Sequence, residues 1–158
     1  MGKNFMNIKD AISAAEAECF ITIGGVRYNF MQAINVEAKI EKTKVEVPIL
    51  GRRNKANKTV GWKGTGSASF HYNTSIFREL LYRFKETGVD EYFDIQIINE
   101  DPTSSVGRQE IILKDCNIDG GILAKFDADS SDNLTEDFDF TFEDFEIPKK
   151  FGILQGMR

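Results

Sequence analysis

Apolar and polar residues alternate along most of the chain, which predicts a protein built mainly from β-strands. The segments CFITI (19–23) and VRYNF (26–30) flank the turn Gly24-Gly25, a pattern typical of a β-hairpin. A second Gly-Gly pair at 120–121 predicts another turn of this kind. Further strands are predicted at 61–72, 92–99, 108–119, 122–128 and 135–147.

The longest strand is expected over residues 32–47, where the strand pattern continues for 16 residues. Up to Ile40 the apolar residues fall on even positions, whereas the later valines fall on odd positions. A β-bulge near 42–44 is the simplest cause of this change. The strand at 135–147 changes phase in the same way near Glu143. Strands usually have about five or six residues, so we expect the long strand to run past the edge of its own domain.

A long loop is predicted after this strand, because PILGRRNKANKTV (48–60) opens with proline and is mostly polar. With the bend that precedes it, the loop is taken as residues 42–60. One α-helix is predicted over 74–87, where apolar residues recur at helical spacing. Thr74 is placed to cap its start, and Gly88 stands where a C-cap belongs.

About seven strands and one helix predict a mainly-β fold, a β-sandwich or β-barrel with one flanking α-helix. The length of 158 residues predicts one domain, which we place at 19–147. Residues 1–18 are expected to form an N-terminal arm with at most a short helical turn. Residues 148–158 are expected to form a basic, partly apolar C-terminal tail.

Composition narrows the functional classes. Hydrophobic residues make up 41% and charged residues 28%, a globular balance that excludes global disorder. The net charge of −5 disfavours a protein that binds duplex nucleic acid over most of its surface. Apolar runs are only a few residues long, and the first residues lack the apolar core of a secretory signal. We therefore expect a protein that is made and kept in the cytosol.

Residues capable of catalysis are scarce. His71 is the only histidine, and Cys19 and Cys116 stand alone without metal or redox spacing. GWKGTG lacks the spacing and ending of a P-loop. DADSSD (127–132) lacks the glycine and closing glutamate of a calcium-binding EF-hand loop. We therefore expect no catalytic residues, no metal and no cofactor.

The charges are distributed unevenly along the chain. Residues 51–63 contain five basic side chains and no acid, whereas residues 127–146 contain nine acids and no base. Two solvated surfaces are one interpretation. The other is that the basic segment of one copy meets the acidic segment of the next, a heterologous contact that generates rings or filaments. On this second interpretation the contact residues are Arg52, Arg53, Lys55, Lys58, Asp137, Asp139, Glu143 and Asp144.

Four stretches of the chain closely resemble the tail tube (tail core) proteins of contractile phages, above all the XkdM-like family of PBSX-type prophages of Gram-positive bacteria. The resemblance runs from about Ile12 to Phe151. The combination of GRR and GTG in the middle with FTFEDF near the end is specific. The four stretches are EVPILGRR, GWKGTGSASFHYNTSIF, KETGVDEYFDIQIINEDPTSSVGRQ and LTEDFDFTFEDFEIP.

This resemblance implies a fold shared with the tube proteins of type VI secretion and of R-type bacteriocins. It also implies hexameric rings stacked into a hollow tube inside a contractile sheath, with baseplate and tail terminator proteins at its ends. Genome DNA would pass through the lumen without specific binding, and the subunit itself would not insert into a membrane. The implied location is the virion tail, assembled in the host cytoplasm.

A lumen that lets DNA slide should not be strongly basic, because basic walls gain binding free energy from counterion release. The polar side of the two long strands meets this condition, and the acidic side of 135–147 is a competing choice. Two alternatives to a phage tube stay open, the tube of an R-type bacteriocin and a monomeric β-barrel that binds a small ligand. The expected lumen residues are Asn35, Glu37, Lys39, Glu41, Thr65, Ser67 and Ser69.

Overall fold

A computed structural model describes residues 5–13, 15–129, 131–154 and 156–157, so the first four residues of the predicted arm lie outside it. The described residues form two compact units. The first unit comprises residues from 1–31, 92–115 and 144–158, and the second comprises 32–91 and 116–143. The predicted single domain at 19–147 stays a prediction, and each unit is described by itself.

The first unit is an antiparallel sheet that begins with the predicted hairpin. Its strand order is β2-β1-β5-β6, and β8 pairs with β6. Gly24 and Gly25 form the hairpin turn with φ of 58° and 82°, a region that favours glycine. Alternate residues face the core, with Ile21 and Ile95 almost fully buried. The elements are η1 (Ile8–Asp10), β1 (Ala17–Ile23), β2 (Val26–Asn29), β5 (Phe93–Glu100), β6 (Arg108–Ile118) and β8 (Asp144–Lys149).

The second unit is an antiparallel sheet packed against one helix. Its order is β7-β4-β3, and the last residues of β6 pair with β7. The helix packs through Phe77, whose ring centroid lies 5.5 Å from that of Phe70 and 4.5 Å from that of Phe138. These aromatic side chains are buried and form the core of the unit. The elements are β3 (Ala33–Val47), β4 (Ala56–His71), α1 (Ile76–Thr87) and β7 (Thr135–Phe142).

Two glycines of β4 make room for the aromatic core. Gly64 is paired with Phe142, and Gly66 is paired with Phe140. A Cβ atom on Gly66 would lie 2.3 Å from Phe140 Cζ, and one on Gly64 would lie 2.5 Å from Phe142 Cε2. Each phenyl ring therefore lies over a glycine of the neighbouring strand. The close approach that these glycines permit explains their place in a strand.

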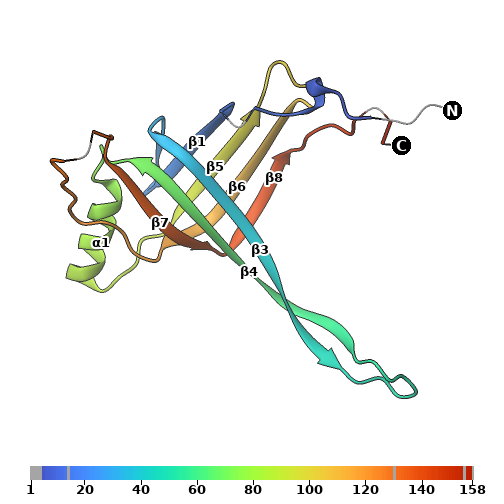
Figure 1. Cartoon of the computed structure of the whole chain (residues 1–158). Coiled ribbons are helices and arrows are strands. Elements are labelled where there is room, and N and C mark those ends of the chain that lie inside the picture. Colours follow the sequence, from blue (N-terminus) through green and yellow to red (C-terminus); the bar gives the residue numbers. More distant parts are fainter. Residues whose placement is uncertain (1–4, 14, 130, 155, 158) are drawn as a thin grey trace. The chain divides into compact units, whose positions relative to one another are not determined.

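The β3–β4 hairpin continues beyond β7 as a two-stranded ribbon that ends in a tip (Figure 1). β4 pairs with β7 from Gly64 to His71, whereas β3 and β4 stay paired as far as Val47 and Ala56. The predicted bulge is confirmed, because the register shifts between Thr43 and Lys44. The long strand thus extends past the part of β4 that pairs with β7, and its extension past the edge of the domain stays a prediction.

The structure corrects several predicted boundaries. The predicted extent of the loop, residues 42–60, is wrong. The loop contains only the residues between Val47, where β3 ends, and Ala56, where β4 begins. The segments before and after this loop are paired as strands. Their polar composition does not indicate strands, so the sequence predicted a longer loop. The N-cap of α1 is Ser75 rather than Thr74, and Thr74 Oγ1 accepts a hydrogen bond of 3.4 Å from Ile76 N. The predicted C-cap at Gly88 is confirmed, with φ of 71°.

Two other segments also differ from the prediction. Residues 122–128 are irregular, and the pair at 120–121 does not turn a hairpin. Leu123 and Phe126 are exposed, so this short apolar run has no core to face. The predicted strand at 135–147 breaks at Glu143 into β7 and β8. Both pair with β6, but only β7 also pairs with β4. None of the helices in the described residues is long and apolar enough to cross a membrane.

Candidate functional site: a polar sheet face and a basic hairpin tip

The polar side of the second unit's sheet consists of matching rows of residues from β3, β4 and β7. Paired residues of an antiparallel sheet place their side chains on the same face. The register therefore gathers all the expected lumen residues on one surface. In the order β3, β4, β7, the rows are Asn35–Ser69–Asp137, Glu37–Ser67–Asp139 and Lys39–Thr65–Thr141, followed by the pair Glu41–Lys63.

The acidic side of β7 belongs to this same surface. Asp137 and Asp139 stand beside Ser69 and Ser67 in the register. Ser69 Oγ donates a hydrogen bond of 2.5 Å to Asp137 Oδ1. The two surfaces that the sequence left as competing lumen choices are thus one continuous face.

Carboxylates outnumber cations on this polar face. Lys39 Nζ lies 3.9 Å from Glu41 Oε1 in an exposed pair, so its charge is partly compensated. Asp119 and Asp139 border a groove of about 470 Å³ on the same face. This face carries small polar side chains and a net negative charge, so it would repel phosphate.

The opposite side of these strands is occupied by the core. Val36, Ala68 and Phe138 form one row there, and Ala38 and Gly66 continue toward Phe140. Ala68, Phe138 and Phe140 are buried. The polar face is therefore the side of this sheet that remains open to another molecule.

Glu136 departs from the acidic pattern of its neighbours. It was counted in the acidic segment, but its side chain is buried on the core side of β7. Arg78 of α1 donates a hydrogen bond of 2.9 Å from Nη1 to Glu136 Oε2, and its guanidinium lies 4.3 Å from the ring centroid of Tyr72. The even numbering that Glu136 shares with Phe138 signals this position. The ion pair fastens the helix to the sheet.

The other two acids of the expected contact do not extend the polar face. Glu143 lies at the break after β7 and is exposed. Asp144 opens β8 in the first unit, where its Oδ1 accepts a hydrogen bond of 2.8 Å from Phe145 N. The four acids predicted as one contact surface therefore divide into a pair on the polar face and two separate positions.

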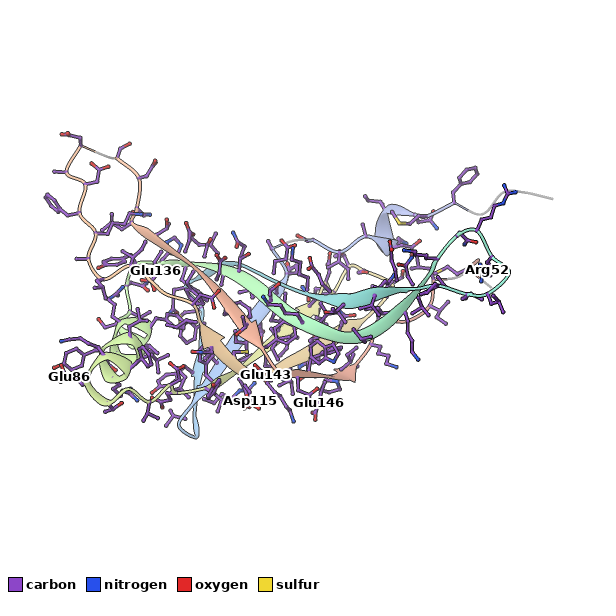
Figure 2. The ribbon with its side chains drawn as sticks, turned by 90° about the horizontal axis from the view of Figure 1, so that it is seen from below. Arg52, Glu86, Asp115, Glu136, Glu143 and Glu146 are labelled. Atoms are coloured by element: carbon purple, nitrogen blue, oxygen red, sulfur yellow. The ribbon has the colours of Figure 1, made fainter. Side chains whose placement is uncertain are left out.

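The basic residues gather at the end of the β3–β4 ribbon. Figure 2 shows Arg52 at this tip, at the opposite end of the second unit from Glu86 of α1. Arg52, Arg53, Lys55 and Lys58 are all exposed. Lys55 Nζ lies 4.0 Å from Glu46 Oε2, a surface pair of little strength. The tip consequently carries a net positive charge.

The histidine and the two cysteines are among the described residues, and each has its own surroundings. His71 is exposed, and Cys19 and Cys116 are buried and form no disulfide. Burial raises the pKa of the Cys19 thiol to about 12, which keeps it protonated and unreactive at neutral pH. Among the residues that the structure describes, no three His, Cys, Asp or Glu side chains are grouped as a metal ion would need.

Comparison with solved structures places the fold among tube proteins of contractile systems. The sheath-tube complex of an extracellular contractile injection system, PVC, contains a chain that matches with a TM-score of 0.65 and 12% identity, covering 89% of this chain and 93% of that chain. A solved Bacillus subtilis protein is 35% identical with a TM-score of 0.51, covering 87% of this chain and 99% of its own. The mainly-β fold with one helix is confirmed.

Sequence comparison agrees with the structural one. The phage-like element PBSX protein XkdM of Bacillus subtilis (strain 168) is 43% identical over 114 residues, which is 72% of this chain and 77% of the relative. A family model described as "Phage tail tube protein" matches residues 4–149. This chain therefore belongs to the phage tail tube protein family and is a tail tube subunit.

Proposed function

We propose that copies of this chain form hexameric rings that stack into the hollow tube of a contractile phage or prophage-like tail. A sheath protein surrounds the tube, and baseplate and terminator proteins close its ends. DNA passes through the lumen without lasting contact. The tube is assembled in the host cytoplasm and ends up in the virion tail.

The observation that carries this proposal is the continuous polar face of β3, β4 and β7. It carries serines, threonines and more carboxylates than cations, so it would not bind the phosphates of DNA strongly. Because the opposite face is core, this surface fits the lining of a channel. The lumen residues are Asn35, Glu37, Lys39, Glu41, Thr65, Ser67 and Ser69, joined by Asp137 and Asp139.

The edge of β3 supports lateral assembly of copies into a ring. β3 stands at the end of the strand order, and within the described chain its outer edge pairs with no other strand. An edge strand of 15 residues is a strong template for pairing with another chain. A neighbouring copy in the ring would satisfy these backbone groups.

Thiol labelling of bare tubes tests the lumen assignment. We compare Ser67→Cys on the polar face with Glu86→Cys on α1, which packs on the opposite side of the sheet. In assembled tubes, a PEG-maleimide wider than the bore should label Glu86→Cys and spare Ser67→Cys, while both variants react in the unassembled subunit. Equal labelling of both variants in tubes would place Ser67 outside the lumen. Failure of the wild-type protein to form tubes or rings at high concentration would overturn the proposed function itself.

A further inference from the structure

The tip of the β3–β4 ribbon carries an apolar pair followed directly by a basic pair. Leu50 is fully exposed and Ile49 is 40% exposed, and Arg52 and Arg53 follow after Gly51. Covering apolar surface is favourable by about 25 cal/mol per Å². Within its own unit, Leu50 stays exposed to solvent, and the basic side chains of the tip outnumber the acidic ones near them.

A groove with the complementary character lies beside α1. Its volume is about 360 Å³, and its lining includes the apolar residues Leu80, Phe84 and Ile118, which we call its floor. Phe84 is 47% exposed although it belongs to the apolar stripe of the helix. An apolar floor open to water in this way is ready to be covered by an apolar side chain.

The rim of this groove is acidic. We use the word rim for the acidic residues of its lining, which are Asp90, Glu91 and Asp119. Glu91 already forms an ion pair with Arg83, and Asp90 Oδ2 accepts a hydrogen bond of 3.3 Å from Asn117 Nδ2. The net negative charge of the rim therefore comes mainly from Asp90 and Asp119.

We propose that the hairpin tip of one copy docks into the α1 groove of another copy. Leu50 covers the apolar floor, and Arg52 and Arg53 face Asp90 and Asp119. The tip and the helix lie at opposite ends of the second unit, so the contact joins two copies rather than closing within one (Figure 2). The inference rests on the proposed function, because it requires the copies to assemble.

The contact is heterologous, since two different surfaces of the same chain meet. Such contacts repeat head to tail, and they generate a ring where the rotation between copies closes and a filament where it does not. Asp137 and Asp139 were predicted to contact the basic residues, but they also lie on the face assigned to the lumen. Asp137 and Asp139 can line the lumen because the basic tip has another acidic partner.

Cross-linking between two single-cysteine variants tests this contact. Leu50→Cys and Phe84→Cys are prepared separately, mixed as minor components with wild-type protein, assembled, and treated with a short bismaleimide. Doping keeps the tube intact even if a variant assembles poorly. The native thiols are buried and stay silent. Leu50→Cys mixed with Asp139→Cys, and Leu50→Cys mixed with Asp129→Cys, serve as controls for the polar face and for the acidic loop.

We expect a covalent dimer with Phe84→Cys and its loss with either control. A dimer that forms with Asp139→Cys or Asp129→Cys instead would overturn the groove as the docking site. Intact tubes without any dimer would overturn it as well. In both of these outcomes the tube is present, so they are distinguished from failure of the proposed function, in which wild-type protein forms no tube.

Discussion

Ser69 and Asp137 join two strands across the polar face, with Ser69 Oγ donating a hydrogen bond of 2.5 Å to Asp137 Oδ1. The next residue back along β7, Glu136, points the opposite way and is held by Arg78 in the core. Adjacent carboxylates on one strand therefore serve different purposes. Asp137 shapes the surface that we assign to the lumen, and Glu136 fixes α1.

This contrast gives the first prediction. Glu136→Gln should lower the free energy of unfolding by about 3 kcal/mol, the low end for breaking a buried pair, because Arg78 keeps some contact with solvent. Asp137→Asn, an isosteric change on the exposed side, should shift it by less than about 0.5 kcal/mol. Urea unfolding of both variants measures the difference. Equal effects would show that the ion pair does not hold the helix.

The second prediction concerns the glycines beneath the phenyl rings. Gly66→Ala places a Cβ 2.3 Å from Phe140 Cζ and 2.8 Å from the backbone oxygen of Glu37. The ring and strand must shift, which should cost about 1–3 kcal/mol. Gly61→Ala in the same strand is the matched control, since its Cβ meets nothing within 4 Å. Denaturant midpoints should fall for Gly66→Ala and stay near wild type for Gly61→Ala.

The third prediction follows from the carboxylates that hold the N-terminal arm. Asp101 accepts hydrogen bonds from Thr103 and from Ser13 N, and these bonds hold its pKa below the ordinary value of 3.8. Asp10, bonded to Ser105 and Asn7, has its pKa lowered for the same reason. A lowered pKa in the folded state contributes stability above the unfolded pKa that is lost as pH falls through the folded value. The stability that these carboxylates give the arm should therefore begin to fall below about pH 4, and it should be lost as the pH passes through their lowered pKa in the folded protein.

Hydrogen exchange of the arm amides measures this release. Asp101→Asn should loosen residues 11–13 already at neutral pH and flatten the pH dependence. A Glu18→Gln variant, on an exposed residue of β1, serves as the control for a change of one charge. Arm protection with the same pH dependence in wild-type protein and in Asp101→Asn would contradict the assigned role of these carboxylates.

Much of the fold could be predicted because period-two patterns mark strands that have one buried face. The alternation around Val36 and Ala38 predicts both the long strand and its polar side, and the register confirms that side. The strand predicted at 122–128 is wrong, because Leu123 and Phe126 are typical strand residues in sequence but are exposed in the structure. The bulge predicted near Glu143 is instead a break between two strands, since sequence phase does not show that the pairing with β4 ends at Phe142.

The candidate site was predictable only in part for a related reason. Sequence shows which residues alternate on one strand, but not which strands are neighbours. That Ser67 and Asp139 share one face depends on the β4–β7 register, a long-range pairing. The α1 groove combines Phe84 with Asp119 from distant segments, and no local pattern brings such residues together.

The last prediction concerns the basic tip. The double variant Arg52→Glu with Arg53→Glu should block tube growth, because its new carboxylates would face the acidic rim of the next copy. Like charges in contact cost several kcal/mol of association free energy. The fold should be unaffected, since exposed charge changes shift stability by less than about 0.5 kcal/mol. Lys9→Glu with Lys150→Glu, two exposed lysines outside the hairpin, provides the same change of charge as a control. Sedimentation and thermal melting separate the two properties. If the tip variant sediments as tubes in wild-type yield, the tip is not an assembly contact; if it melts early, its effect is on folding and not on the interface.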